Sequence, residues 1–250
     1  MNTMPDVFPL SWLNANVLSN PMLTADTASM FWHGLVQTTH LVIVSLLLGL
    51  LLAVPFAIMR CSRIWWLDKP VWCFTYLFRG TPLLIQLYLI YYGVGFTLGE
   101  SLDKGTLLGS LIHEPVYSAL LAFTLNTAAY TTEIFRGAIR ATPHGEIEAA
   151  RSFGMSRALM MRRIILPSAF RRALPAYGNE IIFMLHASTI ASVITLMDIT
   201  GVAYYLYSRF YAPFTAFIIA AMLYMVLSFI VQGAFKQLEK RLLVHQRPAT

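Results

Sequence analysis

Long uncharged apolar runs restrict the fold of this sequence more than any other feature. Five stretches contain no Asp, Glu, Lys or Arg, and they cover residues 41–59, 80–99, 115–132, 181–197 and 210–235. A helix needs about 20 mostly apolar residues to cross the hydrocarbon core of a bilayer. The shorter runs can borrow residues at their ends, because tilt and neighbouring helices change the required length. The runs therefore predict an all-α integral membrane protein with five transmembrane helices.

The overall composition excludes an ordinary soluble domain. Only 12% of the residues are charged, whereas soluble domains carry roughly 25%. The mean hydropathy is +0.62. A soluble helical protein with five such runs would have too little polar surface to cover its core.

The basic residues are distributed unevenly, and this predicts the orientation. Every Lys and Arg except Lys104 and Arg209 lies within residues 60–79, 136–172 or 236–247. Because an excess of Lys and Arg marks the cytosolic side, we expect the N-terminus outside and the C-terminus inside. The net charge of +6 is then a topology signal, and no nucleic-acid partner is expected.

These runs and charges divide the chain into three parts. We expect an external tail over residues 1–32, a transmembrane domain over 33–240 and a cytosolic tail over 241–250. The tail of residues 1–32 contains no Lys or Arg, so it lacks the basic region of a cleaved signal peptide, and the first span should act as an uncleaved anchor. The expected spans are about 33–59, 71–97, 115–137, 174–198 and 210–235.

The cytosolic stretch between the third and fourth spans is too long to lack structure of its own. The sequence predicts a short helix over residues 146–153, a turn at Gly154, and a second helix over 157–166 that Ser156 caps and Pro167 stops. Its small residues and arginines fit either a docking surface for a partner protein or a helix lying on the membrane. The pattern alone leaves both open.

Within this stretch, the segment of residues 142–167 carries a spaced motif, which runs from Glu148 to Pro167. The motif begins with Glu148-Ala149-Ala150. Three residues then separate Ala150 from Gly154, and nine residues separate Gly154 from Ile164-Ile165-Leu166-Pro167. This resembles the EAA motif of ABC importer permeases in every element and both spacings. Residues 79–86 (RGTPLLIQ), 126–136 (NTAAYTTEIFR) and 178–180 (GNE) resemble the polar amino acid branch of that family, and the resemblance covers about residues 33–240.

The resemblance implies a type I ABC importer permease fold in a bacterial inner membrane, with a periplasmic N-terminal tail. It also implies a coupling helix that contacts an ATPase. The candidate coupling residues are Glu146, Glu148, Ala149, Ala150, Arg151 and Gly154.

The partners implied by the resemblance are a second permease subunit, identical or homologous, two ATP-binding subunits and a periplasmic solute-binding protein. The cargo implied is an amino acid, with basic ones (histidine, lysine, arginine, ornithine) favoured over glutamine or glutamate. The sequence contains no G-x-x-x-x-G-K-[ST] motif, so ATP and Mg²⁺ are expected on the partner ATPase. This chain is then a transport subunit in contact with lipid, with no catalytic residues and no cofactor of its own.

Polar side chains inside the spans are the candidates for a substrate site, since an ionisable group there is costly and usually functional. Six residues are expected to contact substrate: Asn126, Tyr130, Glu180, His186, Ser188 and Thr189. For Glu180 a cationic substrate and a structural partner such as Arg172 both remain open. Asn126, Tyr130 and His186 have a packing alternative. Ser188 and Thr189 lie in a run of small polar residues (HASTIAS, 186–192), where a break in the fourth helix is expected; such a break needs a cavity or surrounding protein. For Glu133 a structural ion pair with Arg136 or Arg140 is favoured.

Two rival classes of function remain to be weighed. A channel or passive pore would have no reason to carry the full EAA spacing. A membrane enzyme would need a catalytic constellation, and the sequence has no H-E-x-x-H or G-x-S-x-G motif. The six histidines also lack the spacing of metal ligands, so no metal site is expected.

Overall fold

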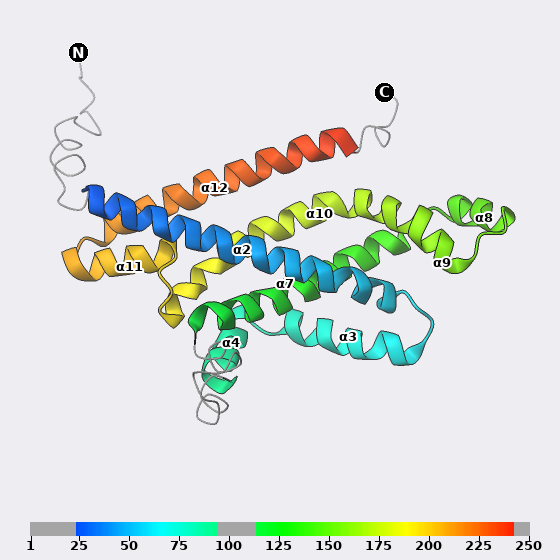
Figure 1. Cartoon of the computed structure of the whole chain (residues 1–250), viewed down its shortest axis with the longest axis horizontal. Coiled ribbons are helices and arrows are strands. Elements are labelled where there is room, and N and C mark those ends of the chain that lie inside the picture. The colour runs from blue at the N-terminus through cyan, green and yellow to red at the C-terminus, as the bar shows by residue number, and fades with distance from the viewer. Residues whose placement is uncertain (1–23, 95–113, 243–250) are drawn as a thin grey trace, which may run out of the picture.

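A computed structural model describes residues 24–94 and 114–242, and this part of the chain is helical without any strand (Figure 1). Residues 1–23 of the expected N-terminal tail, residues 95–113 with the end of the second expected span, and residues 243–250 lie outside it. The described elements are α2 (Ala25–Arg60), α3 (Trp65–Gly80), α4 (Leu83–Tyr88), η2 (Leu89–Val94), α7 (Pro115–Arg140), α8 (His144–Ser152), α9 (Arg157–Met160), η3 (Met161–Ile165), α10 (Leu166–Ala187), η4 (Ser188–Ile194), α11 (Ile199–Phe210) and α12 (Pro213–Leu242).

Helix α7 forms the centre of the bundle and packs against α2, α3, α4 and α10. Its buried residues are mostly alanine and threonine, and such small side chains let helix backbones approach closely. A Cβ atom added at Gly49 of α2 would lie 2.3 Å from the Thr127 methyl group. Gly49 is therefore required for the contact between α2 and α7.

Two of the described helices, α2 and α12, are by themselves long and apolar enough to cross a membrane. Two further pairs meet the same criteria together, although each is bent: α3 with α4 and η2 by 106°, and the helix of residues 157–194 with α11 by 46°. Helix α7 is not among them, in spite of its 26 residues. Since its neighbours are protein on several sides, it needs less apolar surface than a helix that faces lipid.

The second predicted span is interrupted in the structure. Residues 71–97 were expected to form one helix, but the helix ends at Gly80 and a new one begins at Leu83. Thr81 and Pro82 are extended between them, because a proline disfavours helical backbone in the residue before it. The uniform hydropathy of residues 80–99 gave no sign of this bend.

The fourth span breaks where its run of small polar residues predicts a break. The α-helix ends at Ala187, a 3₁₀ segment follows, and Thr195 adopts a positive φ of 67°. Asp198 then caps α11 by accepting a hydrogen bond from the Gly201 N–H at 2.7 Å. Helix α11 covers residues 199–210, which were expected to be a loop.

Residues 142–167, the segment that was expected to be cytosolic, form most of the predicted helix–turn–helix. Helix α8 ends at Ser152, Gly154 has a φ of +72°, and the Ser156 hydroxyl accepts a hydrogen bond from the Leu159 N–H at 3.3 Å. The expected stop at Pro167 is wrong, because the chain continues as helix through η3 into α10. Pro167 lies in the first turn of α10, where its missing N–H costs little.

The N-terminal helix is longer than expected. It begins at Ala25 instead of residue 33, so residues 25–32 of the expected tail are helical. The start is fixed by a capping box, in which the side chains of Thr24 and Thr27 accept hydrogen bonds from each other's backbone N–H.

The C-terminal ends of α2 and α12, the start of α3, and helices α8 and α9 all lie toward one end of the bundle (Figure 1). Together with the end of α7, η3 and the first half of α10, which adjoin α8 and α9 in the chain, these segments carry 13 of the 18 Lys and Arg residues.

Candidate functional site

A pocket with a volume of about 640 Å³ lies between α7, α10 and the break between α3 and α4. Asn126 and Tyr130 reach it from α7, and Glu180 reaches it from α10. The structure therefore brings together three of the six residues that the sequence proposes for substrate binding. The remaining lining is Thr81, Pro82, Leu83, Ile134, Ala176, Asn179, Phe183, Met184 and Ala187.

Glu180 is the acidic group of this pocket, and only 7% of its surface is exposed. Its Oε1 accepts a hydrogen bond from the Thr127 hydroxyl of α7 at 3.2 Å. Within the described part of the chain, Glu180 forms no ion pair and its Oε2 accepts no hydrogen bond. A buried carboxylate is costly unless it is paired, so the free oxygen is suited to a cationic ligand. Arg172, the expected structural partner, contacts other groups instead.

The side-chain amide of Asn126 is bonded within the protein through its nitrogen, whereas its oxygen is free among the described residues. Its Nδ2 donates to Gln86 Oε1 at 3.0 Å. The Gln86 amide in turn donates to the Phe78 carbonyl and to both oxygens of Thr81, at 2.7 to 2.9 Å. This network stabilises the break before Leu83. The Asn126 side-chain carbonyl has no partner among the described residues, and it can accept a hydrogen bond from a ligand ammonium.

Arg79 places a positive charge at the edge of the same pocket. Its guanidinium lies 5.3 Å from the centre of the Tyr130 ring, a distance at which a cation is attracted to the ring face. The charge of Arg79 also acts on the Glu180 carboxylate. The pocket thus has an acidic group inside it and a basic group at its edge.

The other three predicted substrate residues do not line this pocket. His186 Nε2 lies 3.0 Å from the Ser228 hydroxyl of α12. Ser188 and Thr189 donate to carbonyls of their own turn, Leu185 and His186, at 2.7 and 2.8 Å. These contacts give each of them a local packing role in this structure.

Glu133 belongs to an ion cluster at the ends of α2, α3 and α7. Its carboxylate pairs with Arg136 at 2.7 Å, as expected, and also with Arg60 at 3.2 Å. The Thr75 hydroxyl donates to it at 3.2 Å, and Arg60 additionally pairs with Asp68. These contacts support the favoured interpretation of Glu133 as a member of a structural ion pair. Arg60 was not expected as a partner, and Arg140 is not among the described ion-pair partners of Glu133.

The candidate coupling residues lie on a helix that is largely detached from the bundle. Helix α8 extends beyond the other helices at one end (Figure 1) and has no extensive packing against any described helix. Five of the six predicted residues are exposed: Glu146, Glu148, Ala149, Arg151 and Gly154. Ala150 is buried, with 2% of its surface exposed. A helix with this much free surface is available to a partner protein.

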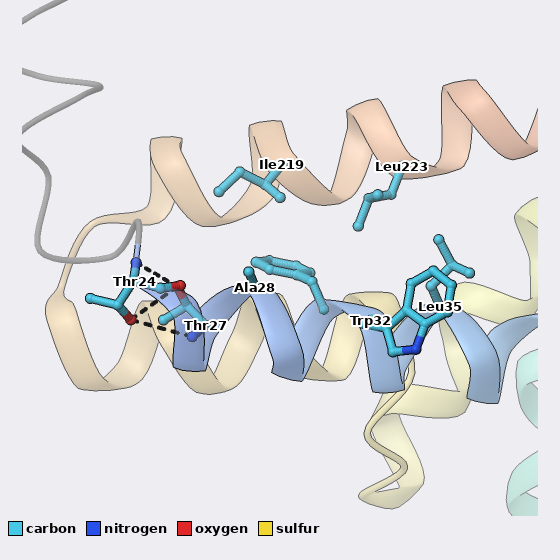
Figure 2. Close-up of a pocket in the computed structure, with 8 residues that line it drawn as sticks. Thr24, Thr27, Ala28, Trp32, Leu35, Ile219 and Leu223 are labelled. Atoms are coloured by element: carbon cyan, nitrogen blue, oxygen red, sulfur yellow. Dashed lines mark hydrogen bonds between the residues drawn. The ribbon is translucent and has the colours of Figure 1, made fainter.

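A second pocket, of about 400 Å³, lies between the start of α2 and α12. Figure 2 shows Trp32, Leu35, Ile219 and Leu223 around it, with Thr24 and Thr27 hydrogen-bonded to each other at one end. Phe31 also lines it. Its lining offers no charged group. It suits an apolar occupant rather than an amino acid.

A buried carboxylate in a pocket of a helical bundle that contains helices able to cross a membrane is typical of a membrane transport protein. Residues 45–244 match the family model described as binding-protein-dependent transport system inner membrane component, and the chain belongs to this family. The predicted resemblance to importer permeases is confirmed.

The relatives agree with this family. The permease protein HisM of the histidine/lysine/arginine/ornithine transport system of Escherichia coli (strain K12) is 48% identical over 218 residues, which is 87% of this chain and 90% of HisM. The octopine transport system permease protein OccM of Rhizobium meliloti is 42% identical over 220 residues, covering 88% of this chain and 89% of OccM.

Solved structures show the same fold. A chain from the crystal structure of an amino acid ABC transporter with histidines superposes with a TM-score of 0.76 at 34% identity, covering 86% of this chain and 95% of that chain. A chain from an inward-facing conformation of the MetNI methionine ABC transporter gives a TM-score of 0.72 at 18% identity, covering 88% and 99%. The second likeness shows the fold alone.

Sequence reasoning missed two residues of the site. Arg79 stands in the stretch 79–86 that carries the family resemblance, but its position beside Tyr130 depends on the bend between α3 and α4. Thr127 follows Asn126 directly and points to a different helix, α10. Nothing in the local pattern marks it as the donor to Glu180.

Proposed function

We propose that this chain is the membrane-spanning permease subunit of an ATP-driven importer of amino acids, with basic amino acids as the cargo. The observation that carries the proposal is the buried Glu180 carboxylate with an unpartnered oxygen in a pocket between α7 and α10. Family membership and the HisM relative support the same assignment.

The charges of the site match the common chemistry of its proposed cargo. Every amino acid carries an ammonium and a carboxylate, and a basic one carries a second cation. Glu180 and the Asn126 carbonyl are acceptors for a cation, and Arg79 at the pocket edge is a donor to a carboxylate. Tyr130, which also lines the pocket, would contribute apolar ring surface for the aliphatic part of the side chain.

The chain is proposed to cross a bacterial inner membrane five times, with the N-terminus in the periplasm and the C-terminus in the cytosol. Helices α2 and α12, the two bent pairs and the central helix α7 supply these spans. The clustering of the basic segments at one end of the bundle (Figure 1) supports the orientation, since that end would be cytosolic.

The proposed partners follow from the family and from surfaces of the chain. A second permease subunit, homologous or identical, would complete the wall of the translocation path, because among the described residues only α7, α10 and residues 81–83 line the pocket. Helix α8 would dock on one of two ATP-binding subunits, which bind ATP and Mg²⁺. A periplasmic solute-binding protein would deliver the amino acid.

The mechanism proposed is alternating access. ATP closes the nucleotide-binding subunits, helix α8 moves with them, and the pocket changes its accessible side. A ligand shifts such an equilibrium only by its different affinity for the two states. The free oxygen of Glu180 supplies this difference if the pocket closes around a cation in one state only.

Uptake into proteoliposomes by the assembled complex tests the proposal. We expect ATP-dependent uptake of radiolabelled lysine that excess unlabelled arginine or histidine inhibits and glutamine inhibits weakly. Competition by glutamine in preference to lysine would instead favour a polar neutral cargo. Uptake without ATP would indicate a channel or passive pore.

A further inference from the structure

Arg172 connects three segments of the cytosolic half of the protein. It lies on α10, and its Nη1 donates to the Ser168 hydroxyl of the same helix at 2.6 Å. Its Nε donates to the Ala138 carbonyl near the end of α7 at 3.2 Å. Its Nη2 donates to the Thr142 hydroxyl at 2.7 Å. One guanidinium therefore joins α10, α7 and the link that leads to α8.

Thr142 is the residue through which this link is held. It stands between the end of α7 at Arg140 and the start of α8 at His144. Only 4% of its surface is exposed, and its own hydroxyl donates to the Ile139 carbonyl at 2.7 Å. The hydroxyl is thus fixed in direction and presents its lone pair to Arg172. A displacement of α8 has to move Thr142 or break this bond.

Few other paths lead from α8 to the bundle. Within the described part of the chain α8 packs extensively against no other helix, and its far end leads through the glycine turn at Gly154. At the start of α8, the connection to α10 is the hydrogen bond that Arg172 donates to Thr142 in the link before the helix. Load applied to α8 by a partner can reach α10 along the chain through α9 and η3, and directly at this point through the Arg172 contacts.

Arg172 is also attached to both walls of the substrate pocket. Helix α7 carries Asn126 and Tyr130, and its cytosolic end is bonded through the Ala138 carbonyl. Helix α10 carries Glu180 eight residues beyond Arg172, or about 12 Å along the helix at 1.5 Å per residue. A displacement of the Arg172 side chain by the link to α8 would therefore shift the two walls relative to each other.

We infer that Arg172 is a positioning residue that transmits the movement of helix α8 to the pocket between α7 and α10 through its bond to Thr142. The inference rests on the proposed function, since it assumes that α8 is moved by an ATPase. The guanidinium suits this role because its planar, rigidly oriented N–H groups can hold three acceptors at once. Without it, α8 would be linked to the pocket walls only through the chain segments that join it to α7 and α9, and more ATP would be hydrolysed per substrate transported.

The test compares variants of the complete transporter in proteoliposomes. The quantity measured is ATP hydrolysed per radiolabelled lysine taken up, together with the KM for lysine. For Arg172→Gln we expect this ratio to rise at least about fivefold, a typical size for coupling between two sites, while KM stays within about twofold. Arg172→Lys keeps the positive charge but lacks the planar set of guanidinium N–H donors, so it should retain more coupling than Arg172→Gln and less than the wild type.

Two matched controls isolate the bond itself. Thr142→Val removes the hydroxyl at nearly constant shape and should raise the ratio as Arg172→Gln does, whereas Thr142→Ser should keep the wild-type ratio. The double variant should be no worse than either single one, because both remove the same bond. Arg171→Gln changes the neighbouring arginine, whose side chain is exposed, and should leave the ratio unchanged.

Several results would overturn the inference. An unchanged ratio in Arg172→Gln would do so, as would equal losses of ATP hydrolysis and uptake, which indicate a purely structural role. If Arg172→Gln fails to assemble, Thr142→Val decides, and a wild-type ratio there rejects the inference. A wild-type complex that takes up no lysine contradicts the proposed function as a whole, whereas a transporting wild type with a normal Arg172→Gln ratio contradicts only the role of Arg172.

Discussion

The Arg79 guanidinium lies 5.3 Å from the centre of the Tyr130 ring, at the edge of the pocket that Glu180 enters from the opposite helix. A cation therefore lies over the ring of one lining residue, and an anion is another lining residue of the same pocket. The two charged groups should contribute differently to different substrates, because all amino acids share the carboxylate but only basic ones carry a side-chain cation. This difference gives the first two predictions.

Glu180→Gln should weaken transport of basic amino acids selectively. A hydrogen bond to a charged group contributes about 1.5–3 kcal/mol, so we expect the KM for lysine and arginine to rise about tenfold or more. Glutamine transport should change little. Glu114→Gln, which alters an exposed acid at the start of α7, is the control. Equal losses for lysine and glutamine would show that Glu180 acts through the fold.

Arg79→Gln should weaken transport of all amino acids alike, since the substrate carboxylate is common to them. Arg79→Lys should retain part of the activity, because an ammonium is also attracted to the Tyr130 ring. Arg209→Gln offers a matched control: its guanidinium lies over Phe210 on α11, 5.7 Å from the ring centre. A selective effect of Arg79→Gln on basic substrates would contradict the assignment.

Gly154→Val should uncouple ATP hydrolysis from transport through strain at one backbone position. Gly154 has a φ of +72°, and no atom lies within 4 Å of the place that a Cβ would take, so the substitution adds strain of roughly 1–2 kcal/mol without a clash. Gly154→Asn should be tolerated, because asparagine adopts this conformation more readily. Gly145→Val, also without a neighbour within 4 Å and without a positive φ, is the control. Substrate-stimulated ATPase activity distinguishes these variants.

Glu133→Gln should destabilise the protein more than it affects substrate affinity. The change removes the shared counter-ion of Arg136 and Arg60, and Arg60 is only 5% exposed. Losing hydrogen bonds to charged groups costs about 1–3 kcal/mol, which for a chain of this size corresponds to a fall in apparent Tm of roughly 2–12 °C. The Tm of the purified protein in detergent checks this. An unchanged Tm would mean that the cluster contributes little to stability.

The orientation can be tested by labelling single cysteines with an impermeant thiol reagent. The background is the double variant of Cys61→Ser and Cys73→Ser. Ser29→Cys, on the exposed first turns of α2, should react in intact cells. Ser152→Cys, on exposed α8, should react only after permeabilisation. Labelling of position 152 from outside would reject the proposed orientation.

The sequence was informative wherever a local rule decides the structure. The φ of Gly154, the cap at Ser156 and the break at Ser188 were all predicted from residue type and position. The convergence of Asn126, Tyr130 and Glu180 was predicted from polarity inside apolar runs.

The sequence was less informative where tertiary contacts decide. The bend at Pro82 is held by Gln86, whose amide bonds to Phe78 and Thr81, and a hydropathy profile does not report such a network. Pro167 is tolerated because a π-helical turn precedes it. The partner of Glu180, Thr127, depends on how α7 and α10 are rotated against each other.

The modest hydropathy of the central helix α7 has a consequence for the biogenesis of the protein. A segment that is rich in alanine and threonine and contains an asparagine gains little free energy from contact with lipid. Helix α7 would therefore partition poorly into the bilayer without a neighbouring helix. Helix α2 is synthesised earlier, is strongly apolar, and forms the most extensive interface of α7. Entry of α7 into the membrane should therefore be cooperative with α2, and a variant that disturbs Gly49, such as Gly49→Leu, should trap the chain at the insertion step rather than unfold a finished bundle.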